Sequence, residues 1–85
     1  MKKFSYTITD EVGIHGRPAG MLVKKASEYQ SAVTLTSKGK SADAKRIMAV
    51  MGLGVKKGDS VEFSIDGADE AVAAKGLEDF MKANL

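Results

Sequence analysis

Apolar and polar residues alternate along three segments of the chain, and this period of two predicts three strands. The segments cover residues 4–9, 33–36 and 60–65. Because successive side chains of a strand point to opposite faces of a sheet, we expect one face of each segment to be buried. A turn that contains Gly39 follows the second segment and predicts a hairpin to a short further strand at 40–42.

Three other segments have the spacing of helices. From Arg17 to Tyr29 the apolar residues recur three and four positions apart, and Pro18 stands in the first turn, where its missing N–H needs no partner. A short apolar stretch at 47–54, closed by glycines, predicts a second helix. A third helix begins near two acidic residues and ends near Lys82, which complements the helix dipole. Its expected buried face is Ala73, Leu77 and Phe80, with Val72 and Met81 flanking.

The order of elements is therefore β-α-β-β-α-β-α. Short amphipathic strands and helices of this kind fit an antiparallel sheet with the helices packed on one face. We predict an α+β fold built as a two-layer sandwich. We also predict a single domain over residues 1–85, because a chain of 85 residues has apolar side chains for one core only.

The composition excludes several kinds of chemistry. The chain has no cysteine and one histidine, so disulfides and cysteine nucleophiles are excluded, and we expect no metal site and no cofactor. A net charge of +2 does not by itself indicate nucleic-acid binding. No segment approaches the roughly 20 apolar residues of a membrane span. The N-terminus also lacks the pattern of a signal peptide, so we expect a cytoplasmic protein without membrane insertion.

The one histidine, His15, lies at the start of the first predicted helix. A histidine taken alone is an ordinary loop residue in most small proteins. A helix N-terminus, however, presents unpaired N–H groups and a partial positive charge, which bind phosphate and other anions. Imidazole is nucleophilic when neutral, so it accepts and releases a phosphoryl group without a metal.

Three residues after His15 strengthen this interpretation. Gly16 lets the backbone approach an anion, Pro18 fixes the first helical turn, and the guanidinium of Arg17 matches phosphate oxygens. Each has an ordinary alternative role, as a turn residue, a helix starter or a solvated side chain. Their combination predicts a phosphoryl carrier, with His15 as the acceptor and Arg17 as the phosphate clamp. Gly16, Arg17 and Pro18 form the phosphate-binding helix N-terminus.

The segment at 47–54 holds more apolar residues than one buried face requires. Met48 and Met51 are three positions apart, and methionine side chains adapt to several different partner surfaces. One alternative is that both methionines belong to the core. The other is that Ile47, Met48 and Met51 form an outward docking patch beside His15.

Two stretches of sequence carry the likeness to a known family. They are 12–19, which reads VGIHGRPA, and 45–54, which reads KRIMAVMGLG, and the strand at 32–37 agrees with them. The chain resembles, from end to end, the HPr family of phosphocarriers of the bacterial phosphoenolpyruvate-dependent sugar phosphotransferase system. The resemblance implies an open-faced β-sandwich with a four-stranded antiparallel sheet and three helices on one face.

The resemblance also implies a carrier rather than an enzyme. Enzyme I, which takes the group from phosphoenolpyruvate, would phosphorylate His15 at Nδ1, and the group would pass to the sugar-specific enzyme IIA domains. We expect a monomer with one docking face for these partners. The residues assigned to that face are Gly20, Lys24, Arg46, Ile47, Met48 and Met51.

Position 46 departs from many Gram-positive relatives. Those have a serine that a kinase phosphorylates for carbon catabolite control, whereas this chain has Arg46, so the regulatory serine is absent. Arg46 has a permanent positive charge, whereas a phosphoserine at this position would have a charge of about −2. The change also removes a serine able to cap the second helix. With Arg17, Lys24 and Lys45, Arg46 is expected to favour acidic partner surfaces.

Two other interpretations stay open. A paralogue used in nitrogen-related or regulatory phosphotransfer would keep His15 and its chemistry. The other is a small α+β binding module without phosphotransfer. Its RNA-binding form is disfavoured because the predicted strands lack paired exposed aromatic residues on which bases stack.

Overall fold

The elements follow one another in the order that the sequence predicts. The computed structural model describes residues 1–85. The strands are β1 (Lys2–Thr7), β2 (Ala32–Ser37), β3 (Lys40–Asp43) and β4 (Ser60–Asp66). The helices are α1 (Arg17–Ser27), α2 (Ile47–Gly52) and α3 (Glu70–Asn84). The predicted β-α-β-β-α-β-α order is confirmed.

The four strands form one antiparallel sheet in the order β1-β4-β2-β3. β2 and β3 are the predicted hairpin. β4 lies between β1 and β2, so the centre of the sheet is closed by pairings between segments that are distant in sequence. Phe63 of β4 lies opposite both Phe4 and Leu35, and its ring stacks on that of Phe4 with centroids 4.6 Å apart.

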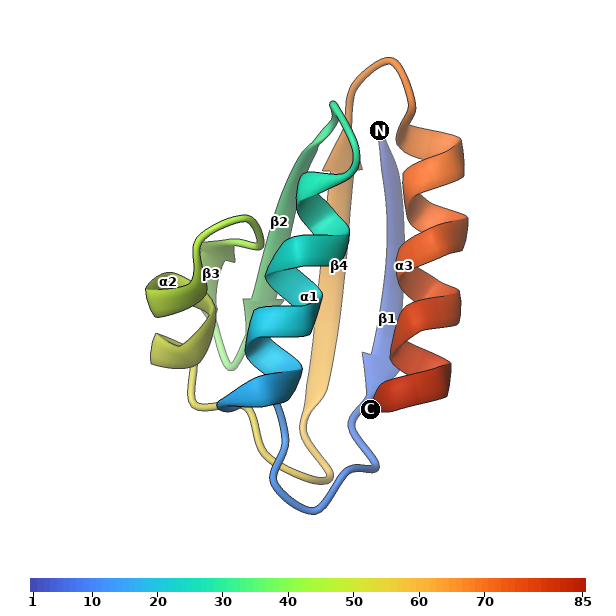
Figure 1. Ribbon diagram of the computed structural model, residues 1–85. Coiled ribbons are helices and arrows are strands. Elements are labelled where there is room, and N and C mark those ends of the chain that lie inside the picture. Colours follow the sequence, from blue (N-terminus) through green and yellow to red (C-terminus); the bar gives the residue numbers. More distant parts are fainter.

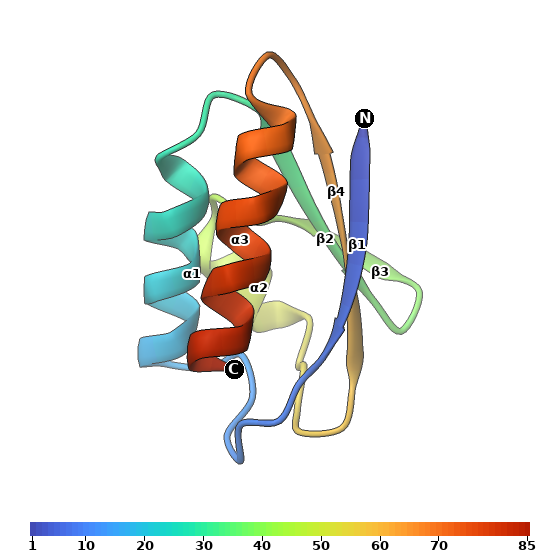
Figure 2. The ribbon, with the colours of Figure 1, turned by 90° about the vertical axis from the view of Figure 1, so that its right-hand side faces the viewer.

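The helices cover one face of the sheet and leave the other face open (Figures 1 and 2). The alternation in β4 shows why: Val61, Phe63 and Ile65 are buried, whereas Glu62 points to the open face and is exposed. α1 contacts both α2 and α3, and α3 also packs on β1 and β4. The prediction of an α+β open-faced sandwich with three helices on one face is confirmed.

The buried face of α3 differs in part from the predicted one. Ala73 and Leu77 are buried as expected, but the third buried residue is Met81 and not Phe80, which is only half-buried. Around the helix axis, Met81 lies about 40° to one side of Leu77 and Phe80 about 60° to the other side. The elements packed against α3, and not the helical spacing alone, therefore decide that Met81 is buried. Val72, also predicted to flank this face, is 66% exposed.

The bounds of α1 and of the first strand also differ from the sequence prediction. α1 ends at Ser27 rather than Tyr29, because the N–H groups of Glu28 and Tyr29 bond to carbonyls three residues earlier, as in a tighter turn. The first strand is Lys2–Thr7 rather than 4–9. Ile8 follows its end and is buried, and its N–H donates to the carbonyl of Asp59 at 2.9 Å.

Candidate functional site

The loop between β1 and α1 carries His15. The carboxylate of Asp10 closes the first turn of this loop by accepting two of its backbone N–H groups. Ile14 is 1% exposed, and its N–H donates to the carbonyl of Val55 at 3.1 Å. Because Ile14 anchors the loop in the core, the next residue, His15, is presented at the surface, where it is exposed.

α1 begins directly after this loop, with Gly16 as its N-cap and Pro18 in its first turn. No side chain caps the helix, and no acidic residue stands in the first turn. A Cβ added to Gly16 would meet no atom within 4 Å, so the space beside this residue is open. The positive pole of α1 therefore faces solvent beside His15 without a compensating carboxylate.

His15 lies in a shallow hollow of about 100 Å³. Three segments line it: the His15 loop, α2, and the loop between α2 and β4. The lining residues are Val12, Ile14, His15, Met51, Gly54, Val55 and Lys56. The sequence pattern indicated His15 and Met51 but not Lys56, which is distant in sequence and belongs to no motif. Lys56 is the one lining residue whose side chain carries a permanent charge.

Gly13 allows the His15 loop to come into contact with the loop between α2 and β4. Both loops lie at the lower end of the two ribbon views (Figures 1 and 2). The φ of Gly13 is +79°, and a Cβ there would lie 2.3 Å from the Val55 oxygen and 2.7 Å from the Lys56 Cα. The N–H of Lys56 also donates to Asp59 Oδ2 at 2.9 Å. This bond, followed by the bond from the Lys38 ammonium, lowers the pKa of the Asp59 carboxyl. The backbone of Lys56 is thus held against the His15 loop.

Arg17 and Lys24 are both exposed on α1. Neither side chain forms an ion pair. Arg17 is the first residue of the helix, so its guanidinium is available to an anion bound at His15. Lys24 lies about 10 Å further along the helix axis, so its position suits a contact with a partner rather than with a group on His15.

The docking residues of α1 and α2 meet at Gly20. A Cβ on Gly20 would lie 3.7 Å from Cδ1 of Ile47, so this glycine faces α2. Met48 is 77% exposed and Ile47 is 42% exposed. Met51 is half-buried and packs against the core while it lines the hollow at His15. The alternative that both methionines belong to the core is therefore wrong for Met48.

Two further apolar residues are exposed, one in the His15 loop and one on α1. Val12 is 60% exposed in the His15 loop, and Met21 is 39% exposed on α1, directly after Gly20. We call Val12, Met21, Ile47 and Met48 the apolar rim. The sequence pattern did not mark Val12 and Met21 as docking residues. Two signals were nevertheless visible: Val12 is an apolar residue in a loop, and Met21 is out of phase with the buried face of its helix.

Arg46 and Lys45 precede α2, but their surroundings differ. Arg46 is the N-cap of α2 and is exposed; its side chain forms no capping bond, so α2 lacks the cap that a serine could supply. Its Nε lies 3.9 Å from the carboxylate of Asp43. The ammonium of Lys45 donates instead to the carbonyl of Tyr29 at 2.8 Å, just past the C-terminal end of α1. Lys45 therefore lies apart from Arg17.

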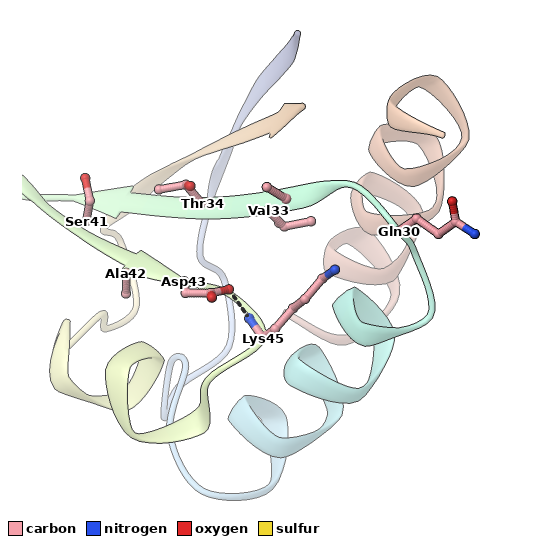
Figure 3. Close-up of a pocket in the computed structure, with 8 residues that line it drawn as sticks. Gln30, Val33, Thr34, Ser41, Ala42, Asp43 and Lys45 are labelled. Atoms are coloured by element: carbon pink, nitrogen blue, oxygen red, sulfur yellow. Dashed lines mark hydrogen bonds between the residues drawn. The ribbon is translucent and has the colours of Figure 1, made fainter. Parts of the chain in front are cut away.

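A larger hollow, of about 500 Å³, lies near the opposite end of α1 (Figure 3). It is lined by Gln30, Lys45 and residues of β2 and β3. The charged groups of this hollow stabilise the local structure: the Asp43 carboxylate accepts a hydrogen bond from the backbone N–H of Lys45 at 2.9 Å.

Nowhere does the structure gather three or more His, Asp or Glu side chains that could hold a metal ion. None of its helices has both the length and the apolar character needed to cross a membrane.

The fold and the site define a class of protein: a small open-faced α+β domain that presents one histidine at the N-terminus of its first helix. The family model described as "PTS HPr component phosphorylation site" matches residues 2–83. The chain belongs to the HPr family, whose members are phosphocarriers and not catalysts.

Solved structures agree with this assignment. An HPr of Thermoanaerobacter tengcongensis is 37% identical, with a TM-score of 0.94 over 98% of this chain and 93% of that chain. A histidine-containing phosphocarrier protein of Mycoplasma is 38% identical, with a TM-score of 0.93 over 96% and 93%. Crh of Bacillus subtilis, a catabolite repression protein that forms a domain-swapped dimer, is 31% identical, with a TM-score of 0.78 over 94% and 92%. The chain is thus similar both to HPr proteins and to a Crh protein.

Proposed function

We propose that residues 1–85 form one cytoplasmic, monomeric phosphocarrier domain. It accepts a phosphoryl group on Nδ1 of His15 from phosphorylated enzyme I and passes it to enzyme IIA domains. One observation carries the proposal: His15 is exposed beside the uncompensated positive pole of α1, within an open hollow. Membership of the HPr family supports the choice of chemistry.

The chemistry needs no metal and no deeply buried base. The neutral imidazole attacks phosphorus, the new P–N bond forms, and the bond between phosphorus and the donor breaks. The negative charge that stays on the phosphoryl oxygens lies near the free N–H groups of α1 and the guanidinium of Arg17. Because the phosphorylated histidine stays exposed, an acceptor can approach the same face and take the group.

The apolar rim and the nearby cations predict the character of the partner's surface. The partner is expected to have an apolar centre that covers Met48 and Ile47. Its acidic residues are expected to face Arg17, Lys24 and Arg46. Met48→Asp places a charge in this contact and should lower the transfer efficiency, kcat/KM with enzyme I, by about tenfold. Val72→Asp is the matched control, because Val72 is also largely exposed but lies on α3, which begins at the other end of the molecule (Figure 1). Equal losses in both variants would argue against this docking surface.

The carrier proposal is tested by incubation with phosphoenolpyruvate and enzyme I, followed by intact mass measurement. We expect the mass of one phosphoryl group to be gained, to be lost in acid, and to be absent from His15→Ala. Because His15 is exposed, this variant should keep the circular dichroism spectrum of the wild type. A wild-type mass that does not change with active enzyme I would refute the proposal.

The match to Crh favours a second candidate, a carrier used in regulation rather than in sugar uptake. Both candidates predict phosphorylation of His15, so they must be separated at the next step. Phosphorylated protein is mixed with purified enzyme IIA domains. Rapid loss of its phosphoryl group to any of them supports the transport role, and retention with all of them supports the regulatory one.

A further inference from the structure

Lys56 has no part in the function proposed above, yet it lines the same hollow as His15. Its ammonium forms no ion pair. The other lysines nearby are engaged: Lys57 pairs with Glu11 at 3.2 Å and Lys38 with Asp59 at 2.9 Å. Lys56 is therefore the cation of this loop that is free to meet an anion.

The position of Lys56 is set by its backbone. The close contact with Gly13 brings its Cα against the His15 loop, and the bond from its N–H to Asp59 closes the turn that follows. No carboxylate lines the hollow. A dianionic group on His15 would thus have the α1 N-terminus and Arg17 from one segment and the Lys56 ammonium from another.

We infer that Lys56 is a second phosphoryl-binding cation, which acts on the phosphorylated form of His15 together with Arg17. The inference rests on the proposed function. Because the unphosphorylated site carries no anion there, Lys56 stabilises the phosphorylated form selectively. It therefore shifts the equilibrium in which phosphoenolpyruvate and the protein exchange the group. In that reaction the P–O bond of phosphoenolpyruvate breaks, the P–N bond on His15 forms, and the enolate leaves and takes up a proton as pyruvate.

The experiment measures this equilibrium and not a rate. Wild type and variants are incubated with a catalytic amount of enzyme I at several fixed ratios of phosphoenolpyruvate to pyruvate, and the phosphorylated fraction is read by intact mass. A catalyst cannot change an equilibrium constant, so altered docking to enzyme I does not affect the result. Lys56→Gln should lower the equilibrium constant by about threefold, the size of one solvent-exposed charge pair.

Two variants make the comparison specific. Lys57→Gln removes the same charge from the next residue and should leave the equilibrium constant unchanged, whereas Lys56→Arg should keep the wild-type value. Equal equilibrium constants for wild type and Lys56→Gln, or equal decreases in Lys56→Gln and Lys57→Gln, would overturn the inference. If the wild type is not phosphorylated at all, the proposed function itself fails, so the two failures are distinct.

Discussion

Gly13→Ala tests how the His15 loop is held. Gly13 has φ +79°, and a methyl group there would overlap the Val55 oxygen, at 2.3 Å, and the Lys56 Cα, at 2.7 Å. Both neighbours are backbone atoms, so rotation of a side chain cannot relieve the overlap. The two loops must move apart, and this movement breaks the bond from the Ile14 N–H to the Val55 carbonyl.

The magnitude follows from two contributions. Alanine in a left-handed conformation costs about 1–2 kcal/mol. Ile14 and Val55 are both nearly fully buried, so loss of their mutual bond leaves buried polar groups without partners, at about 1–3 kcal/mol. Gly13→Ala should therefore lower the free energy of unfolding by about 2–5 kcal/mol.

Gly39→Ala is the matched control. Gly39 has nearly the same φ, +77°, but a Cβ there would meet no atom within 4 Å. This variant should lose only the conformational contribution of about 1–2 kcal/mol. Urea unfolding at 25 °C, followed by circular dichroism, gives both values. If the two variants lose the same stability, the contact between the loops is not what requires glycine at position 13.

Three further predictions follow from other parts of the structure. Gly20→Ala should raise the free energy of unfolding by up to about 1 kcal/mol, because alanine is the better helix former and its Cβ would make an ordinary contact with α2; destabilisation in urea would contradict this. The Ser31 hydroxyl, which donates to Asp69, is the largest of the effects that lower the pKa of that carboxyl. The stabilisation from this bond is present at pH values above the ordinary carboxyl pKa and is lost as the pH falls below it. Asp69→Asn should therefore lower the melting temperature at pH 7 and make it decrease less steeply between about pH 5 and pH 2. Equal pH slopes for wild type and variant would refute that reasoning. Arg46→Ser should slow transfer from enzyme I at low salt and reduce its dependence on ionic strength, while the new N-cap raises the stability by about 1 kcal/mol; unchanged rates and salt slopes would exclude electrostatic steering by this residue.

Most of the fold was determined by local sequence patterns. Alternation with a period of two marked the strands, and Pro18 marked the start of α1, because these signals depend on each residue and its near neighbours. For the same reason the sequence placed His15 beside a helix N-terminus and Arg17 in the first turn. These features do not depend on which distant segment packs against them.

Only the tertiary structure decided which distant residues surround His15. Lys56 reaches the hollow because β1 pairs with β4 and because the loop before β4 contacts Gly13. Neither contact has a local signature in the sequence. Burial by distant elements likewise decided that Met81 rather than Phe80 enters the core and that Met48 stays exposed. The sequence by itself determined the chemical group that can carry phosphate, while long-range packing decided which side chains stand around it, since such contacts depend on strand register and loop closure between segments far apart in the chain.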